Sequence, residues 1–414
     1  MIVVTDYVAN GSFASLAENV QYYTTENYAI LIRLVDYNNN FSGEFVYVNE
    51  HAYNYLSKSK LYGDEIIISN VGANVGTVFK CPNLKKPMTL GPNSIIVKLH
   101  GNNDFYYYWF KSRYGKHCID SIVSGSAQPK FNKTHFKEMA IPVPPIKEQQ
   151  KIASILSSLD SKIENNRKIC ANLEAQAQAL FKHWFIDFAP FKDGKFVESE
   201  LGMIPEGWRV GTYNDIIQET ISGDWGKESL DGNYVHKVAC IRGCDFQDVK
   251  MGLRGKTPER YILEKNFQSK RFEDKDVLVE ISGGTATVST GRICPISQLL
   301  IDKYNGDIIC TNFCRLVRPH KGYSSYLYYS WKYKYDKKVM FGYENGTSGI
   351  KNFSIKDFTT REPLVLPTLT ALNEFEGMIE HIHTQIQNCG SESSKLAVIR
   401  DTLLPKLMSG EIKL

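Results

Sequence analysis

The 414-residue sequence has no apolar run close to the roughly 20 residues that a membrane-spanning helix needs. Its first residues, MIVVTDYVANGS, have no basic segment followed by an apolar core, so we do not expect a signal peptide. The nine cysteines are odd in number and irregularly spaced, which is typical of reduced thiols rather than a disulfide framework. These absences predict a cytoplasmic protein that does not contact a membrane.

Motifs for catalysis are missing as well. The sequence has no Asn-Pro-Pro-aromatic or Asp-Pro-Pro-aromatic motif with a glycine-rich cofactor loop, as a DNA methyltransferase would have. It has no GxxxxGK[ST] phosphate-binding loop, because the glycines of Gly223–Lys227 and Gly252–Lys256 are too close together. No Pro-Asp…(Asp/Glu)-x-Lys nuclease pattern is present either. We therefore expect no catalytic activity from this chain alone.

Two cysteine pairs have spacings that zinc would tolerate, Cys240/Cys244 and Cys310/Cys314. Cys240 and Cys244 are expected to bracket a strand, and a free cysteine is commonly a small buried apolar residue. His381 and His383 are two residues apart on an expected helix, so they cannot share a face. We expect no bound metal, with zinc as the lesser alternative.

What the sequence does contain is ordinary for a globular protein of two or three domains: 43% apolar residues, 23% charged residues and 45 tyrosines and phenylalanines. The formal net charge of +4 neither requires nucleic-acid binding nor opposes it.

Two long segments carry the same heptad pattern of apolar residues, 223 residues apart. In both, steps of four and three alternate without a slip, which predicts a coiled-coil seam. Each stripe covers about 33 residues, or roughly 50 Å of helix at 1.5 Å per residue. The first stripe is Ile152, Leu156, Leu159, Ile163, Asn166, Cys170, Leu173, Ala177, Leu180 and Trp184. The second is Phe375, Ile379, Ile382, Ile386, Cys389, Ser393, Leu396, Arg400, Leu403 and Leu407.

Segments outside the stripes repeat in the same order. Ile32–Tyr37 aligns with Ile241–Phe246 at an offset of 209, and Asp64–Ile68 aligns with Asp276–Glu280 at an offset of 212. Phe131, Phe136 and Pro145 align with Phe353, Phe358 and Pro367 at an offset of 222. The collinear order indicates an internal duplication.

The segment before each stripe alternates short β-type runs with turn residues. Examples are Ile66–Ile68 and Ser94–Val97 in the first copy and Val277–Val279 and Ile308–Ile309 in the second. Helices are expected near Phe105–Tyr114 and Tyr326–Tyr335. The fold class is therefore α+β, with two mixed α/β domains in tandem, each followed by a long helix.

Prolines mark the domain boundaries, because proline is tolerated only before a helix or in its first turn. Pro405 falls within the second stripe, so we expect that helix to kink or end near Leu404. The predicted organisation is a first domain over residues 1–145, a helix over 146–188, a linker over 189–203, a second domain over 204–366 and a helix over 367–414.

The boundary segments resemble the specificity subunits of Type I restriction–modification systems. The resemblance rests on Ile141–Pro145 with Lys147–Ile152, on Leu180–Phe188, on Gly202–Trp208 and on the ending Leu403–Ile412. One departure is that the second domain opens with Ile204–Val210 and the first has no such opening, since Val210 would align with Met1. The first domain is therefore expected to be short at its N-terminus.

The resemblance implies two target-recognition domains held apart along double-stranded DNA by helices that pair as an antiparallel coiled coil with pseudo-two-fold symmetry. It implies a non-catalytic subunit that recognises a bipartite target, two half-sites separated by a nonspecific gap. Its partners would be methylation subunits, two in number, and restriction or translocase subunits, and this chain would direct the adenine methylation and cleavage that they carry out. S-adenosylmethionine, ATP and Mg²⁺ would belong to those partners, and this chain would bind none of them.

Phosphate contacts would come from lysine and arginine, and base contacts from polar side chains on loops. For any one of these residues a solvated surface position is at least as good an interpretation. The candidates in the first domain are Lys80, Lys85, Lys86, Arg113, Lys116, Gln128, Lys130 and Lys133. Those in the second are Arg254, Lys256, Arg260, Arg292, Lys332, Lys334, Lys337, Lys338 and Lys351.

Two alternatives stay open. Asn166, at a seam position, would either set the register against a polar partner or lie at a solvated point. The chain would either bind DNA or be a coiled-coil scaffold without a nucleic-acid role, and only DNA binding predicts an affinity that falls steeply with salt.

Overall fold

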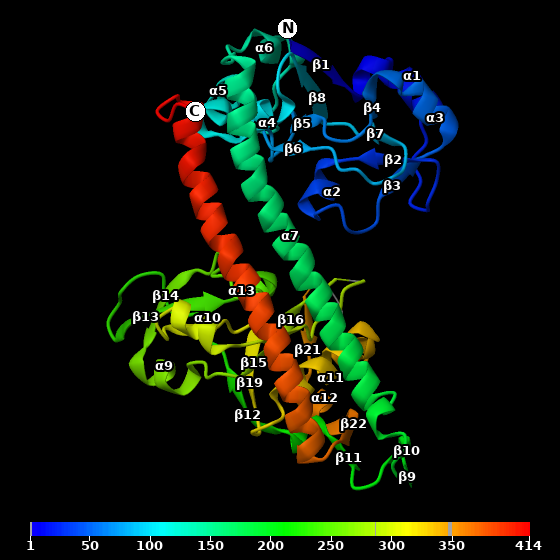
Figure 1. The fold of residues 1–414 in the computed structure, drawn as a ribbon, viewed down its shortest axis with the longest axis vertical. Coiled ribbons are helices and arrows are strands. Elements are labelled where there is room, and N and C mark those ends of the chain that lie inside the picture. Colours follow the sequence, from blue (N-terminus) through cyan, green and yellow to red (C-terminus); the bar gives the residue numbers. More distant parts are fainter. Residues whose placement is uncertain (1, 286, 347–349) are drawn as a thin grey trace. The chain divides into compact units, whose positions relative to one another are not determined.

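A computed structural model describes residues 2–285, 287–346 and 350–414 of the chain (Figure 1). Met1, the residue with which Val210 aligns, lies outside the described residues. The chain divides into two compact units. Unit 1 comprises the residues up to Ser161 together with Leu396–Leu414, and unit 2 comprises Lys162–Lys395. The two longest helices, α7 and α13, each contribute residues to both units.

Unit 1 contains two four-stranded sheets, with strand orders β1-β8-β5-β6 and β3-β2-β7-β4. All pairs are antiparallel except β2 and β7, which run parallel. The strands are β1 (Ile2–Asp6), β2 (Ala29–Ile32), β3 (Val46–Val48), β4 (Lys60–Leu61), β5 (Ile66–Ser69), β6 (Val78–Lys80), β7 (Met88–Leu90) and β8 (Ser94–Leu99).

Unit 2 contains sheets with the orders β12-β19-β15-β17 and β14-β13-β18, and three smaller ladders, β16-β21-β20, β11-β22 and β10-β9. Its strands are β9 (Phe196–Ser199), β10 (Gly202–Pro205), β11 (Arg209–Thr212), β12 (Ile217–Ser222), β13 (Tyr234–Ile241), β14 (Glu259–Leu263), β15 (Val277–Glu280), β16 (Ser282–Gly283), β17 (Ile293–Pro295), β18 (Ile308–Cys310), β19 (Cys314–Pro319), β20 (Glu344–Asn345), β21 (Lys351–Phe353) and β22 (Pro363–Leu366).

The helices of unit 1 are short apart from its shares of α7 and α13. They are α1 (Phe13–Asn19), α2 (Leu34–Asn38), α3 (Glu50–Tyr55), α4 (Asn103–Lys111), α5 (Arg113–Ser121) and α6 (Lys133–Glu138). Unit 2 has α8 (Phe246–Lys250), α9 (Glu264–Lys270), α10 (Gln298–Lys303), α11 (Ser324–Asp336) and α12 (Ile355–Arg361). The long helices are α7 (Ile146–Phe185) and α13 (Leu369–Met408).

The internal duplication is visible in the sheets. The parallel pair β2–β7 in unit 1 and the parallel pair β13–β18 in unit 2 have the same register, since Ile32 lies opposite Leu90 and Ile241 opposite Cys310. Each pair leads into the same turn. Asp36 accepts hydrogen bonds from the backbone N–H, Nε and Nη2 of Arg33, and Asp245 accepts the same three from Arg242.

The two copies differ at the N-terminal end of the second copy. In unit 2, β11 pairs with β22, the strand that leads towards α13. Among the described residues of unit 1, no strand pairs with the corresponding segment, Ile141–Pro145, which precedes α7. Prolines at 142, 144 and 145 explain why this segment forms no ladder, because proline lacks the N–H that a ladder requires.

Two helix predictions need correction. The helix expected over Phe105–Tyr114 is two helices, because the Ser112 side chain accepts a hydrogen bond from Gly115 N–H and starts α5 after α4 has ended. The helix expected to end near Leu404 continues to Met408 with Pro405 inside it. Pro405 lies in the last turn, so the intrahelical hydrogen bond that it cannot donate is lost next to the end of the helix.

The heptad positions form the buried face of both helices, and none of the predicted seam residues is exposed. In unit 1, Ile152, Leu156 and Leu407 belong to one core together with residues of α4 and β5. In unit 2, Ala177, Phe181, Phe375 and Ile379 share a core with α11. Within the described residues, no helix is long and apolar enough to cross a membrane.

Candidate nucleic-acid interface

The middle of the seam in unit 2 is polar. Asn166 is 1% exposed and its Nδ2 donates to the Ser393 hydroxyl at 3.2 Å and to the Glu392 carboxylate at 2.8 Å. It also reaches the Cys389 carbonyl at 3.3 Å. Asn166 therefore faces a polar partner rather than a solvated point. A buried asparagine with specific partners favours one register of two helices over others.

The globular part of unit 2 is joined to both helices by a network of four side chains, two of them buried tyrosines. Tyr328 and Tyr329 of α11 donate to the Glu174 carboxylate of α7, at 2.9 and 3.4 Å. The Tyr329 hydroxyl also lies 2.9 Å from Nε2 of His383 on α13. Burial lowers the pKa of His383, so the ring is held neutral, and burial followed by Glu174 raises the pKa of both tyrosines.

Unit 1 joins its domain to the helices with ionised groups. The Tyr108 hydroxyl of α4 donates to Asp160 of α7 at 2.8 Å. Nη1 of Arg400, on α13, donates to the other Asp160 oxygen at 2.6 Å. The polar seam position Arg400 therefore meets a carboxylate, which explains how an arginine is accommodated on a buried stripe.

Apart from the seam residue Arg400, these junction residues were not identified from the sequence. His383 drew attention only as a rejected metal ligand, and Asp160 and Glu174 lie beside the apolar stripe rather than on it. A usable signal was present, since Asp160 and His383 occupy the same heptad position at the offset of 223 that relates the two stripes.

The predicted DNA-contacting cations separate into two groups. One group is exposed and, among the described residues, forms no ion pair with a carboxylate. Arg113 stacks on Tyr114 and Arg254 on Tyr304, which leaves their charge uncompensated. The group consists of Lys85, Arg113, Lys116, Lys130, Arg254, Lys256, Lys337 and Lys338.

The other group is held by carboxylates of the same unit. Arg292 makes two hydrogen bonds to the buried Glu280, at 2.5 and 2.7 Å, and Arg260 pairs with Glu228 at 2.8 Å while stacking on Trp225. A cation engaged in this way supplies less net charge to a phosphate than a free one. The group consists of Lys80, Lys86, Lys133, Arg260, Arg292, Lys332, Lys334 and Lys351.

The remaining candidate, Gln128, lies exposed in a loop whose ends are tied by backbone bonds between Ser124 and Lys130. Lys130 also bridges Val71, so the loop is anchored to the segment that follows β5. In unit 2 the ladder β16-β21-β20 occupies the position that corresponds to this loop, and it contains Lys351. Residues 347–349 of that copy lie outside the described part of the chain.

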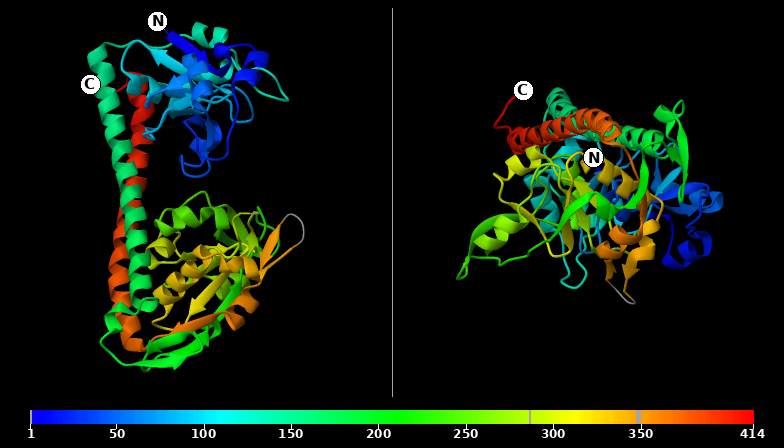
Figure 2. Two further views of the ribbon diagram at one scale, coloured as in Figure 1. Left: turned by 90° about the vertical axis from the view of Figure 1, so that its right-hand side faces the viewer. Right: turned by 90° about the horizontal axis from the view of Figure 1, so that it is seen from below.

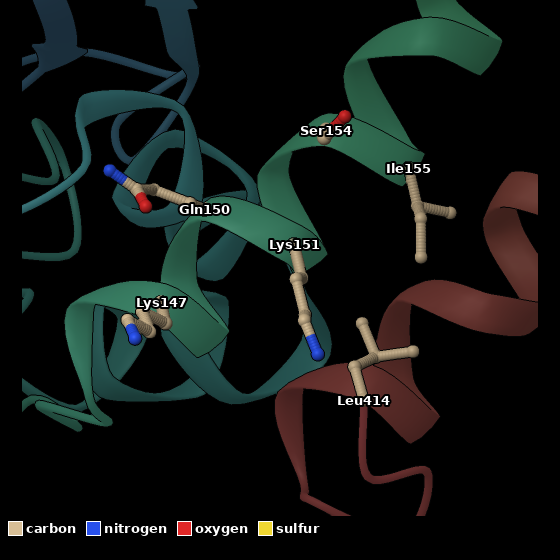
Figure 3. Close-up of a pocket in the computed structure, with 6 residues that line it drawn as sticks. All are labelled: Lys147, Gln150, Lys151, Ser154, Ile155 and Leu414. Atoms are coloured by element: carbon tan, nitrogen blue, oxygen red, sulfur yellow. The ribbon is translucent and has the colours of Figure 1, made fainter.

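An open groove of about 570 Å³ lies between α7 and the C-terminal residue Leu414 in unit 1 (Figure 3). Lys147, Gln150, Lys151, Ser154 and Ile155 line it from α7, and Leu414 closes one side. Lys151 and Ile155 point towards Leu414. The groove offers apolar contact next to positive charge.

The cysteine prediction is wrong in one detail. Cys240 lies within β13, but Cys244 is exposed in the turn that follows, so the two do not bracket a strand. The turn begins because Asp245 fixes Arg242 immediately after Ile241. In the described residues, no group of three or more histidine, cysteine, aspartate or glutamate side chains is arranged to hold a metal.

Comparisons with known proteins agree on one family. The family model of the Type I restriction modification DNA specificity domain matches residues 13–175. The MjaIX specificity subunit of a Type I restriction enzyme from Methanocaldococcus jannaschii is 27% identical over 390 residues, which cover 89% of this chain and 84% of the relative. The HindI specificity subunit of Haemophilus influenzae is 24% identical over 343 residues, covering 69% of this chain and 71% of the relative.

Among solved structures, the S subunit of a Type I restriction–modification system from M. genitalium aligns over 98% of this chain and 96% of its own, with 16% identity and a TM-score of 0.49. The family model over residues 13–175 and the two similar relatives all point the same way, and the chain is similar to the specificity subunits of Type I restriction–modification systems.

Proposed function

We propose that this chain is the non-catalytic subunit that selects the DNA sequence for a Type I restriction–modification complex, and that its target is bipartite. The observation that carries the proposal is the duplication: each unit contains a four-stranded sheet and a sheet with the same parallel register and the same arginine–aspartate turn. Two copies of one recognition domain in a single chain are suited to two half-sites.

The gap between the half-sites would be set by α7 and α13, paired antiparallel as a coiled coil. In support, each unit contains contacts between its shares of the two helices, Asp160 to Arg400 in unit 1 and Asn166 to Ser393 in unit 2. In unit 2 the two helices run side by side in opposite directions (Figures 1 and 2). Each helix has 40 residues, or roughly 60 Å at 1.5 Å per residue.

DNA affinity would come from the exposed, uncompensated cations, and base selection from polar side chains on the same loops. Each phosphate contact releases condensed counterions, so the logarithm of affinity falls linearly with the logarithm of salt concentration. Double-stranded DNA is therefore the expected ligand of Lys130, Arg254, Lys337 and the rest of that exposed group.

Methylation and cleavage would be carried out by partners. Two methylation subunits would bring S-adenosylmethionine for adenine methylation, and restriction or translocase subunits would bring ATP and Mg²⁺. The outer faces of α7 and α13 are available for these contacts. The groove beside Lys147 and Lys151 is one such surface, because it combines apolar area with charge.

The test is genome-wide mapping of methylated adenine after the chain is co-expressed with a cognate methylation subunit. Two short half-sites separated by a fixed gap are expected. A methylated motif with only one half-site would contradict the proposal. So would a complete lack of methylation, provided that the same methylation subunit is active when it is paired with another specificity subunit.

The spacer is tested by inserting four residues after Ser161, in the exposed face of α7. About one turn of helix adds roughly 6 Å, so the separation of the half-sites should change while their sequences stay the same. An identical insertion in the exposed loop at Lys192–Gly194, outside both long helices, is the matched control. An unchanged gap after the helix insertion would contradict the spacer role.

A further inference from the structure

The seam of unit 2 contains two thiols in neighbouring positions. Cys170 of α7 and Cys389 of α13 both occupy heptad positions, one step along from Asn166 and Ser393. Cys170 is 6% exposed, whereas Cys389 is only half-buried. Solvent can therefore reach one member of the pair but hardly reaches the other.

Contacts on both sides of the two thiols place them opposite each other. The Cys170 Sγ lies 3.6 Å from the Ile386 carbonyl, and Asn166 Nδ2 lies 3.3 Å from the Cys389 carbonyl. Moving four residues along α7 thus moves three residues back along α13, as in an antiparallel seam. Burial, and then the adjacent Cys389 thiol, raises the pKa of Cys170 to about 11.

We propose that Cys170 and Cys389 are a redox-responsive pair that forms a disulfide between α7 and α13 when a peroxide is present. The half-exposed Cys389 thiolate attacks the peroxide, giving a sulfenic acid and one water. The sulfur of Cys170 then attacks the Cys389 sulfur, and the hydroxyl group leaves as a second water with the thiol proton. In total, two thiols are oxidised to one disulfide while hydrogen peroxide is reduced to two waters.

The raised pKa of Cys170 suits it to the second step rather than the first. A thiol that is largely protonated at neutral pH reacts slowly with peroxide, whereas a neighbouring sulfenic acid is held at a high effective concentration. The reaction should therefore be faster in mildly alkaline buffer, because the thiolate fraction of Cys170 increases.

Other cysteines of unit 2 lack this combination. Cys240, Cys310 and Cys314 are close enough to influence one another, but all three are buried in the β13–β18–β19 region. None of them offers a half-exposed thiol for the first reaction with peroxide. Cys294 is buried as well, and the exposed Cys244 has no cysteine among the groups that shift its pKa.

The cross-link would act next to a polar layer of the seam. The adjacent layer is the polar Asn166–Ser393 contact, and the Asn166 Oδ1 has no hydrogen-bond partner among the described residues. A covalent bond beside this layer would hold the helices in one register under oxidising conditions.

The test uses the full chain treated with hydrogen peroxide, alkylated, digested without reduction and measured by mass spectrometry. A linked peptide pair containing positions 170 and 389, lighter by two hydrogen atoms than the separate peptides, is expected in the wild type. The pair should be absent from Cys389→Ser. Cys118→Ser is the matched control, since Cys118 is equally half-buried but lies on α5 of unit 1, and it should form the link normally.

Circular dichroism and melting in reducing buffer verify that each variant folds. A second readout is backbone hydrogen exchange of Ile386–Ser393, which should slow after oxidation in the wild type and not in Cys389→Ser. If both thiols of the folded wild type remain free after peroxide, or pair with other cysteines or between chains, the proposal is overturned. The proposal does not depend on DNA recognition, so its failure would leave the proposed function unaffected.

Discussion

The two units connect a tyrosine to a helix at equivalent positions but with different chemistry. The tyrosines are Tyr108 and Tyr329, and their partners Asp160 and His383 occupy matching heptad positions. Unit 1 places an ionised carboxylate there and balances it with Arg400, whereas unit 2 places a neutral imidazole there and adds Glu174 from the other helix. A duplicated junction can therefore keep its geometry while its ionisation changes, because a tyrosine hydroxyl hydrogen-bonds to a carboxylate as donor and to an imidazole nitrogen as donor or acceptor.

The largest difference between the units should come from mutations in the aromatic cores around α4 and α11, the helices that contain Tyr108 and Tyr329. Trp331 is fully buried against Tyr213 and Phe358 and donates from Nε1 to the Gly291 carbonyl at 2.9 Å. We expect Trp331→Ala to lower the free energy of unfolding of unit 2 by about 3–5 kcal/mol. Phe110, at the equivalent position of unit 1, stacks on Phe136.

Hydrogen exchange resolved by peptide should show the loss of protection in unit 2 for Trp331→Ala and in unit 1 for Phe110→Ala. Trp331→Phe, the milder control, keeps the ring packing and should cost about 1–2 kcal/mol through the lost hydrogen bond. Equal loss of protection in both units from either variant would show that the cores are not independent.

The charged junction of unit 1 gives the next largest effect. Arg400 and Asp160 are 25% and 29% exposed, so solvent screens part of their attraction. Arg400→Ala should destabilise unit 1 by about 1 kcal/mol. A double-mutant cycle with Asp160→Asn measures the coupling, which should shrink in concentrated salt. The cycle for Tyr329→Phe and His383→Gln in unit 2 should show no such salt dependence.

Acid should have the opposite selectivity to salt. It should weaken the junction of unit 2, whereas salt weakens the junction of unit 1. Burial lowers the pKa of His383 in the folded state, so the unfolded chain binds a proton first as pH falls. Stability of unit 2 is therefore complete above the unfolded value of about 6.5 and decreases as pH falls through the lowered folded value. The groups facing the ring, Glu174 and Glu376, offset part of this loss.

Melting curves of the wild type and His383→Gln between neutral and mildly acidic pH measure this effect. The wild type should lose more stability than the variant over that interval. A pH dependence of equal size in both proteins would assign the acid sensitivity to other groups.

The smallest effect on stability concerns the surface cations. Lys337→Ala and Lys338→Ala should change the free energy of unfolding by less than about 0.5 kcal/mol. Each should nevertheless reduce the slope of log affinity against log salt for DNA by about 1. Lys334, on the same segment but paired with Glu362 at 2.5 Å, is the matched control and should change the slope less. Equal slopes for all three variants would contradict the division into free and engaged cations.

The sequence by itself determined the duplication, the two long helices and their buried faces. Heptad spacing is a local property of an α-helix, so Ile152, Leu156, Phe375 and Ile379 indicate a buried stripe without knowledge of the partner. The short β-runs and the Ile32–Tyr37 and Ile241–Phe246 repeat likewise follow from nearby residues. The family resemblance rested on such linear motifs.

Only the tertiary structure decided which polar residues meet. Asp160 and Arg400 are 240 residues apart, and Glu174 and Tyr328 are 154 apart, so no local pattern relates them. The same holds for the cations: Lys130 and Lys351 look alike in the sequence, but only Lys351 lies beside a carboxylate, that of Glu344 at 2.8 Å. Pairing depends on the folded positions of both partners, whereas burial periodicity depends on one helix alone.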